Sequence, residues 1–316
     1  MAVLDNIDKE FRVLVGTIGG TKKKPVVEGL EFGNEEQCIA ITTISGLETP
    51  PIRNNSGDWS GRDGGYMSSQ LYSARTITIN GFYWDDAFAC NINSLERKKM
   101  PYSVREQLAN TLMIRKKYPL FFKFIDGRIL YTEGYMIDFK MDYELVSTGS
   151  YQITFYCPGY ALSEATTYGD PTSIWHRQEL HKEIFGGHLV PEELPVLFEE
   201  GKHPATVNYT GMIPSYPLIT YRGPATNPIF MNTAVNKYLR IGSDKQPWSM
   251  VDGQTLTVDM ANRQVLLNGK SVSMYIDSRS DWWYLAPGRN KIYLITDEPT
   301  DTRTAEIRWT NDYQGA

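Results

Sequence analysis

The sequence predicts a mainly β protein: an amino-terminal β-sandwich-like domain with one α-helix, followed by a second β-sandwich or jelly-roll domain. Aromatic residues make up 12% of the 316 residues, including 20 tyrosines, and aromatic side chains favour strands. Residues 75–80 alternate between polar and apolar side chains, as a half-buried strand does. Asp126-Gly127 and Asn268-Gly269 are dipeptides typical of two-residue hairpin turns. A chain of this length is expected to form two domains or one large one.

Strand-like runs dominate residues 1–160, which we expect to form the first domain. Each run is rich in β-branched or aromatic residues and is bounded by glycine, proline, asparagine or aspartate. The runs are residues 25–32, 37–45, 75–83, 120–125, 129–145 and 151–157.

One helix is predicted in this first domain, over residues 104–117. Ser103 can cap it, and Glu106 lies three residues further on, as in a capping box. Leu108 belongs to an apolar stripe with a spacing of four residues. Pro119 follows a basic final turn and prevents continuation. We expect this helix to pack on the sheet and to have a structural role only.

The character of the chain changes over residues 161–210, which we expect to be a connector. A short helix is predicted there from Pro171 or Thr172 to Phe185, with Asp170 as its cap. Residues 211–316 form the second expected domain. Its strand candidates, at the short spacing typical of sandwiches, include residues 254–259, 263–267, 271–276, 291–295 and 305–309.

Composition and charge exclude several classes of protein. The formal net charge is −5 with no basic block, so a grip on nucleic acid backbones is not expected. No apolar run reaches the ~18–20 residues of a membrane span, and no secretory signal is visible at Met1. Cys38, Cys90 and Cys157 are widely spaced, which favours buried thiols of a cytoplasmically made protein.

Patterns that carry enzyme chemistry are incomplete in this sequence, so we expect no catalytic residue, cofactor or metal. Residues 16–22 resemble a phosphate loop, but Thr21 stands where lysine must follow glycine, and we expect a simple turn. His176 and His181 are five residues apart, which separates them by about 140° on a helix. No Gly-x-Ser-x-Gly elbow occurs. Paired carboxylates for glycoside cleavage, which meet in space and not in sequence, leave a glycan-cleaving enzyme as a minor alternative.

Residues 54–66 form the most unusual segment and are predicted to be a glycine-rich loop. Trp59 and Tyr66 have few apolar neighbours in the sequence that could bury them, and Arg62 and Asp63 lie between them. Aromatic side chains together with arginine are typical of contact surfaces. The alternative is that the aromatic rings fold back onto their own sheet.

A second candidate contact follows the strand at residues 75–80. Phe82, Tyr83 and Trp84 are consecutive, and alternate side chains of a strand point to opposite faces. At least one of the three is therefore expected to meet something other than the core, and a neighbouring subunit is the simplest partner.

Several segments of the chain occur in an informative order. They are 48–51 (ETPP), 61–65 (GRDGG) and 75–81 (RTITING) in the first half, and 227–230 (NPIF), 256–259 (LTVD), 265–269 (VLLNG) and 282–290 (WWYLAPGRN) in the second. The predicted helix and the Asp126-Gly127 hairpin lie between these two groups. This order resembles the distal tail protein family of siphophages, the phages with long flexible tails.

The resemblance implies a structural virion protein. It implies a hexameric ring at the distal end of the tail, closed by domain 1–160 and carrying a galectin-like domain 211–316. The implied partners are further copies of the chain, the major tail tube protein, the tape-measure protein, the tail-associated tip protein and the receptor-binding or baseplate proteins. The implied location is the virion tail tip, after assembly in the host bacterial cytoplasm. No membrane is implied, and DNA is only cargo that passes through the lumen.

A carbohydrate-binding adhesion module of the tail tip is the main alternative. Trp282, Trp283 and Tyr284 motivate it, because aromatic faces stack on sugar rings. Galectin sugar sites carry His-x-Asn-x-Arg on one strand, and the stretch from His203 to Asn208 has a different spacing. We therefore expect a galectin-like fold without β-galactoside binding.

Overall fold

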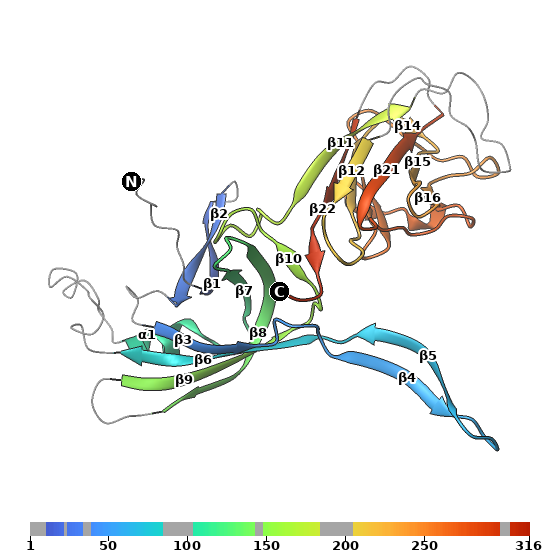
Figure 1. The fold of residues 1–316 in the computed structure, drawn as a ribbon. Coiled ribbons are helices and arrows are strands. Elements are labelled where there is room, and N and C mark those ends of the chain that lie inside the picture. The colour runs from blue at the N-terminus through green and yellow to red at the C-terminus, as the bar shows by residue number, and fades with distance from the viewer. Residues whose placement is uncertain are drawn as a thin grey trace, which may run out of the picture. The chain divides into compact units, whose positions relative to one another are not determined.

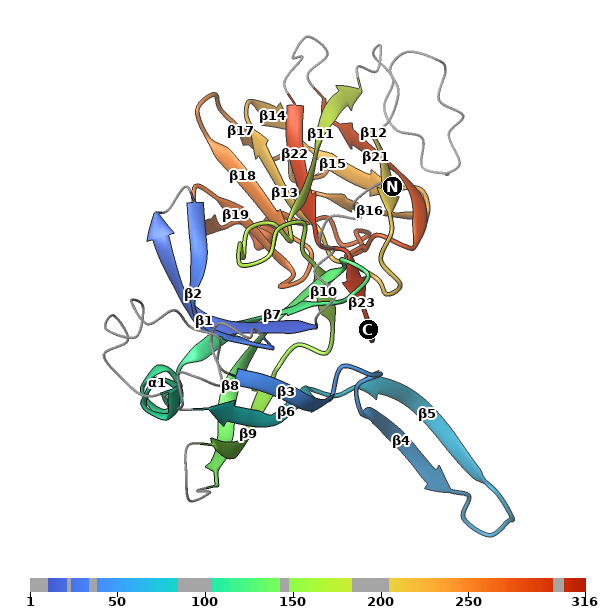
Figure 2. The same cartoon turned by 60° about the vertical axis from the view of Figure 1, so that its left-hand side comes forward.

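The computed structural model describes residues 11–21, 24–33, 39–84, 104–142, 148–183, 205–297 and 304–316. The chain divides into two compact units. The first comprises Met1–Ile174 together with Tyr313–Ala316, and the second comprises Trp175–Asp312. Both units are built mainly of strands, and α1 (Val104–Thr111) is the α-helix found among the described residues (Figures 1 and 2). The fold is therefore mainly β, as predicted.

A single antiparallel sheet organises the first unit. Its strands lie in the spatial order β2 (Lys24–Phe32), β1 (Arg12–Thr21), β7 (Lys117–Lys123), β8 (Ile129–Met141), β9 (Thr148–Cys157), β6 (Arg75–Trp84) and β3 (Ile39–Ser45). Two short strands, β10 (Leu162–Glu164) and β23 (Asp312–Tyr313), join it off this path.

The larger core cluster of the first unit lies on one face of this sheet, as the alternation in β6 predicted, and a smaller buried cluster holds Phe121 and Tyr131, which alternate with members of the larger one. Ile77 and Ile79 have no exposed surface, whereas Thr76 between Arg75 and Ile77 is exposed. Across the strand pair, Ile77 faces Phe155 and Ile79 faces Ile153 in β9, and both partners are also fully buried. Burial of such side chains contributes about 1.5–3 kcal/mol each, so this face holds the unit together.

The helix prediction is wrong in its last six residues, 112–117. Helix α1 ends at Thr111, and Lys117 already begins β7. The Tyr118 hydroxyl accepts a hydrogen bond from the Met113 N–H (2.6 Å) and lies 3.1 Å from the Thr111 carbonyl oxygen, so it satisfies the helix end. Arg115 has a φ of 64°, which no continuing helix allows. Pairing of β7 with β1 and β8 prevails over the helical tendency of residues 112–117.

The second unit is a sandwich-like arrangement in which both halves of one sheet contribute to one core. One half consists of β22 (Thr304–Trp309), β13 (Leu218–Arg222), β18 (Thr255–Asp259), β19 (Gln264–Leu267) and β20 (Lys270–Ser271). The other consists of β16 (Lys237–Arg240), β15 (Ile229–Asn232), β21 (Gly288–Ile295) and β12 (Ala205–Tyr209). The short strands β14 (Ala225–Thr226) and β17 (Ser249–Met250) pair with each other, and a 3₁₀ turn covers Ser273–Tyr275.

Strand β11 (His176–Glu183) joins the two halves, and it corrects the prediction of a short connector helix. It pairs with β22 over six residues in antiparallel register, and with β21 in parallel register at its far end. The predicted cap, Asp170, does bond the Thr172 N–H (2.8 Å), but it closes a turn and not a helix. Phe185 lies outside the described residues. Asp170 thus marks a turn and not the start of a helix, and long-range pairing decides the conformation that follows it.

Hairpin turns were predicted with more success. Gly127 has a φ of 88°, and Asn268 and Gly269 have φ values of 49° and 81°, as a type I′ turn requires. Residues 16–21, by contrast, are not the simple turn that we expected. They are part of β1 and pair with β2, and a Cβ at Gly16 would lie 2.3 Å from the Glu28 carbonyl oxygen. The glycines there allow close approach of two backbones.

The unit boundaries that the structure shows differ from the divisions expected at 160/161 and 210/211. Strand β10 belongs to the first unit and β11 to the second, and both lie within the expected connector 161–210. Residues Tyr313–Ala316 return to the first unit. The roles that we assigned to the segments 1–160, 161–210 and 211–316 stay predictions.

Candidate subunit-contact site

The segment predicted to be a loop, residues 54–66, lies mostly within a two-stranded hairpin, which we call the arm. The arm consists of β4 (Ile52–Asp58), β5 (Gly65–Tyr72) and the tip between them. The two strands pair with each other, and no third described strand pairs with either. Every residue of the two strands is exposed except the half-buried Gly57. Figures 1 and 2 show the arm projecting from the sheet of its own unit.

The loop prediction failed because nothing in the arm alternates between apolar and polar residues. Cross-strand hydrogen bonding forms the arm, and no buried side chain supports it. A register shift at Asn55/Ser56 places an extra residue in β5. An isolated two-stranded hairpin is only marginally stable in water. The arm is therefore a structure that a partner surface would stabilise.

The tip of the arm carries an ordered cluster of the predicted residues. The rings of Trp59 and Tyr66 lie 5.3 Å apart, and the Arg62 guanidinium carbon lies 4.0 Å from the centre of the Trp59 ring. The backbone N–H of Trp59 donates to the Gly64 carbonyl (3.1 Å), and this bond closes the turn. Gly64 has a φ of 96°, a backbone conformation that favours glycine.

The cluster forms within the arm itself, and its aromatic side chains remain exposed to solvent. Trp59 and Tyr66 keep 43% and 47% of their surfaces exposed, and Asp63 is also exposed beside them. A Cβ at Gly57 would lie 3.0 Å from the Tyr66 hydroxyl oxygen, so the tyrosine ring lies across that glycine. Stacking between an arginine and a tryptophan contributes ~0.5–1 kcal/mol at an exposed site. The predicted contact residues are thus brought together, and the alternative, that the rings pack on the main sheet, is not what the structure shows.

The second predicted contact, Phe82–Tyr83–Trp84, divides as the alternation requires. Tyr83 is 4% exposed and belongs to the core, whereas Phe82 on the opposite face is 47% exposed. The backbone of Trp84 pairs with Thr148, and its side chain lies outside the described residues. The structure therefore places Phe82 and Tyr83 on opposite faces of β6. Their role in a contact stays a prediction.

Among the described residues, the titratable side chains of Cys157 and His176 take part in packing. Cys157 is fully buried, and burial raises the pKa of its thiol to about 12. The ring of His176 stacks on Trp309 with 5.8 Å between centres. No cluster of three or more metal-ligating side chains occurs among the described residues. No described helix is long and apolar enough to cross a membrane.

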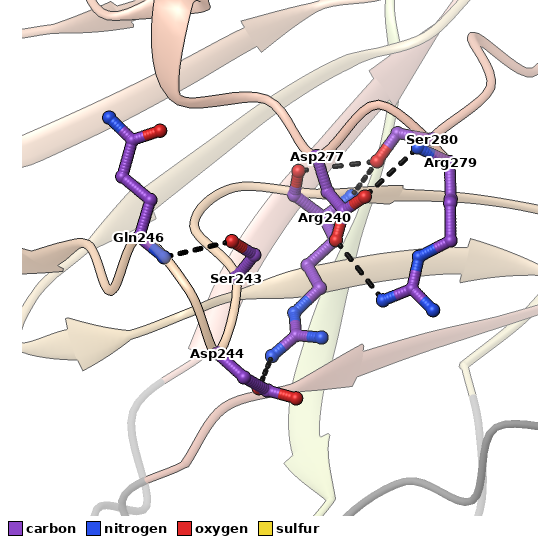
Figure 3. Close-up of polar contacts among 7 residues, drawn as sticks. All are labelled: Arg240, Ser243, Asp244, Gln246, Asp277, Arg279 and Ser280. Atoms are coloured by element: carbon purple, nitrogen blue, oxygen red, sulfur yellow. Dashed lines mark hydrogen bonds and ion pairs between the residues drawn. The ribbon is translucent and has the colours of Figure 1, made fainter.

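One polar cluster in the second unit was missed by sequence reasoning (Figure 3). The Arg240 guanidinium donates to Asp244 (2.7 Å), and the Arg240 N–H donates to the Ser280 hydroxyl (2.9 Å). Asp277 accepts from the backbone N–H of Arg279 (2.9 Å) and pairs with its guanidinium. Burial acts to raise the pKa of Asp277, but the Arg279 bonds and charge prevail and lower it. Each carboxylate is already paired, so the cluster fixes two loops against each other.

Trp282 and Trp283, two of the three aromatic residues that suggested a sugar-binding site, pack into or against the core of the second unit. Trp283 is fully buried and donates its indole N–H to the Phe230 carbonyl (3.0 Å). Trp282 is partly buried against the same core. Tyr284 packs edge-on against Tyr216, with 5.9 Å between ring centres. No two of the three predicted aromatic residues form an open platform.

Comparison with known proteins gives a family match over part of the chain and a structural likeness over nearly all of it. Residues 210–313 match the family described as the siphovirus-type tail component, C-terminal domain. The structure is similar to the phage SPP1 Dit protein, described as a paradigm of the hub adsorption apparatus in phages that infect Gram-positive bacteria. That likeness has a TM-score of 0.59 at 14% identity and covers 96% of this chain and 98% of the other.

A weaker likeness is found to a chain of the phage P2 baseplate in its activated conformation with Ca. It has a TM-score of 0.42 at 12% identity and covers 97% of this chain and 99% of the other. No curated protein sequence matches the chain.

The family match over residues 210–313 supports a structural role in a siphovirus-type tail. The chain as a whole has the fold of the SPP1 Dit protein. Both comparisons agree with the expected resemblance to the distal tail protein family, and the expected fold class is confirmed.

Proposed function

We propose that the chain is a distal tail protein, which forms a hexameric ring at the distal end of the phage tail and uses the arm to contact the neighbouring subunit. The ring links the tail tube and the tape-measure protein to the tail-associated tip protein and to the receptor-binding or baseplate proteins. The protein acts without catalysis or a cofactor, and it is assembled in the host cytoplasm. The observation that carries the proposal is the arm, a hairpin with two exposed faces and a preformed aromatic–arginine tip.

Apolar side chains along the arm support a large partner surface. In addition to the tip cluster, the arm exposes Ile52, Met67, Leu71 and Tyr72, which are 51%, 57%, 54% and 38% exposed. Large apolar side chains exposed on both faces of one hairpin are of the kind that interaction sites use in soluble proteins. A tail has a central passage, so copies that repeat around its axis use a heterologous contact that closes. An arm on each copy that rests on the next copy meets this requirement.

Native mass and negative-stain images of the purified chain test the ring. We expect particles of six copies with a central hole, and we expect Trp59→Ala and Tyr66→Ala to reduce ring formation at least about 10-fold, as truncation of interface anchors does. The melting temperature of each variant should change little, because both rings are half exposed and lie outside either core.

Met274→Ala is the matched control, since Met274 is 76% exposed in the second unit and lies far from the arm in sequence. It should leave the ring intact. A wild-type chain that stays monomeric at tens of micromolar, or alanine variants at the tip that assemble normally, would contradict the proposal.

A glycan array distinguishes this function from a sugar-binding adhesion module. We expect no β-galactoside binding, because Trp283 is buried and Asp244 and Asp277 are held by arginines. Sub-millimolar binding by the full chain would favour the adhesion module instead.

A further inference from the structure

Arg75, the first residue of β6, is a fully buried arginine whose partners are backbone carbonyls. Its Nε donates to the Tyr160 carbonyl (3.2 Å). One terminal nitrogen donates to Gly46 (2.6 Å) and Glu48 (2.9 Å), and the other to Tyr160 (2.9 Å) and Gln314 (2.6 Å). These five bonds use all five donors of the guanidinium, which keeps its charge in proteins.

The acceptors come from segments that lie far apart in the chain. Gly46 and Glu48 precede β4, and Arg75 follows β5, so the guanidinium lies where the two strands of the arm leave the sheet. The Ser73 N–H donates to the Pro51 carbonyl (2.8 Å) and closes the same base. A Cβ at Gly46 would lie 1.9 Å from the Thr76 carbonyl oxygen, so glycine is needed for this approach.

The fourth acceptor belongs to residues 313–316, which follow the second unit in sequence but are part of the first. The side chain of Gln314 also accepts from the Tyr72 hydroxyl at the end of β5 (2.6 Å). The Ala316 N–H donates to the Leu47 carbonyl (2.9 Å). Tyr72 stacks on Tyr160 with 5.4 Å between ring centres. Residues 313–316 thus form hydrogen bonds on both sides of the base of the arm, to Leu47 before β4 and to Tyr72 at the end of β5.

We propose that residues 313–316 and Arg75 form a staple that sets the base of the arm. Because the staple needs residues beyond the second unit, the arm reaches its final form only after the chain has been synthesised past that unit. Partly made chains then cannot enter the ring, a consequence that rests on the proposed function. Arg75 is a positioning residue in this scheme, since it acts on the arm through the backbone that it holds.

Hydrogen exchange on the full chain and on a variant ending at Tyr313 tests the staple. Both proteins carry Trp59→Ala, so that assembly does not protect the arm. We expect exchange in peptides 46–51 and 72–78 to be at least about 10-fold faster in the shortened chain, because a buried charged group loses an acceptor. Peptide 255–267 in the second unit should not change.

Two variants of the full-length chain complete the test. Arg75→Lys should reproduce the faster exchange, because a lysine ammonium cannot reach four carbonyls in a planar fork. This variant decides the question if the shortened chain is insoluble. Gln314→Ala removes only the side-chain bond to Tyr72 and keeps the main-chain acceptor of Arg75, so its exchange should lie between wild type and the shortened chain.

Unchanged protection in both the shortened chain and Arg75→Lys would overturn the staple. The ring is measured separately, with the tip intact, where the shortened chain should assemble at least about 10-fold less. If the unmodified chain forms no ring at all, the proposed function fails, while the exchange comparison still decides whether the staple exists.

Discussion

The arm and the hairpin β18–β19 are both antiparallel pairs with tight turns, yet they are stabilised in opposite ways. In β18–β19 the side chains of Leu256, Val258 and Val265 have no exposed surface, and they belong to the core of the second unit. In the arm neither face is buried. A strand pair that exposes apolar residues and has no core of its own fits the proposed subunit contact, whereas β18–β19 is stabilised within its own unit.

A matched pair of leucine truncations should show the largest contrast. Leu256→Ala leaves a cavity in the core of the second unit and should cost about 2–5 kcal/mol of its unfolding free energy. Leu71→Ala on the arm, where the side chain is 54% exposed, should cost less than about 0.5 kcal/mol. Thermal or urea unfolding of the two variants measures both. Equal losses would mean that the arm is packed like the inner hairpin.

Backbone strain at the tip should give a smaller and more local effect. Gly64→Val forces a β-branched residue to a φ of 96° and should cost about 1–3 kcal/mol within the arm. The reporter is hydrogen exchange of the Trp59 amide, which bonds to the Gly64 carbonyl. Ser60→Val changes a neighbouring tip residue that is not held at positive φ, and it should leave that amide protected. Equal exchange in the two variants would contradict the strain argument.

The smallest effect is expected for the buried thiol of Cys157, which should react little with alkylating reagents and should not titrate near neutral pH. Burial raises the pKa of Cys157 to about 12, so the thiol stays protonated and should resist alkylation at pH 8 until the protein unfolds. The unfolded thiol has the lower pKa, about 8.5. The contribution of Cys157 to stability is therefore complete below that pH and is lost as the pH rises toward 12.

Mass mapping of the alkylated protein, with and without urea, checks the cysteine prediction. Ready labelling of native Cys157 would show that this face of the sheet opens. Unfolding measured from pH 8 to pH 11 should show falling stability, and Cys157→Ser, whose hydroxyl does not titrate in this range, should fall less steeply.

Local signals were reliable where the structure is decided locally. Asn268-Gly269 formed the predicted turn because two adjacent residues with positive φ suffice for it. The alternation in β6 placed Ile77 and Ile79 in the core because neighbouring side chains of a strand point to opposite faces. Trp59, Arg62 and Tyr66 lie together at the arm tip with their aromatic rings exposed, because few apolar neighbours in the sequence could bury them, and their role in a contact stays a prediction.

Predictions failed where distant pairing decides the conformation. Residues 112–117 have helical character, but β7 pairs with β8 from Lys117 onward and with β1 from Leu120 onward. Residues 176–183 follow a good helix cap and still form a strand, since β22 offers six residues of antiparallel ladder. A cap stabilises a helix by about 1 kcal/mol, less than burial of one large side chain in a sheet contributes.

The sequence by itself determined the β-rich class, the hairpin turns, the buried face of β6 and the aromatic–arginine composition of the arm tip. All of these follow from the preferences of a few neighbouring residues. The tertiary structure alone decided that residues 52–72 form an arm, that β11 joins the two halves of the second unit, and that Arg75 meets four carbonyls. The physical reason is that backbone groups are the same at every residue, so the sequence carries no direct signal of which distant carbonyl a buried donor will find.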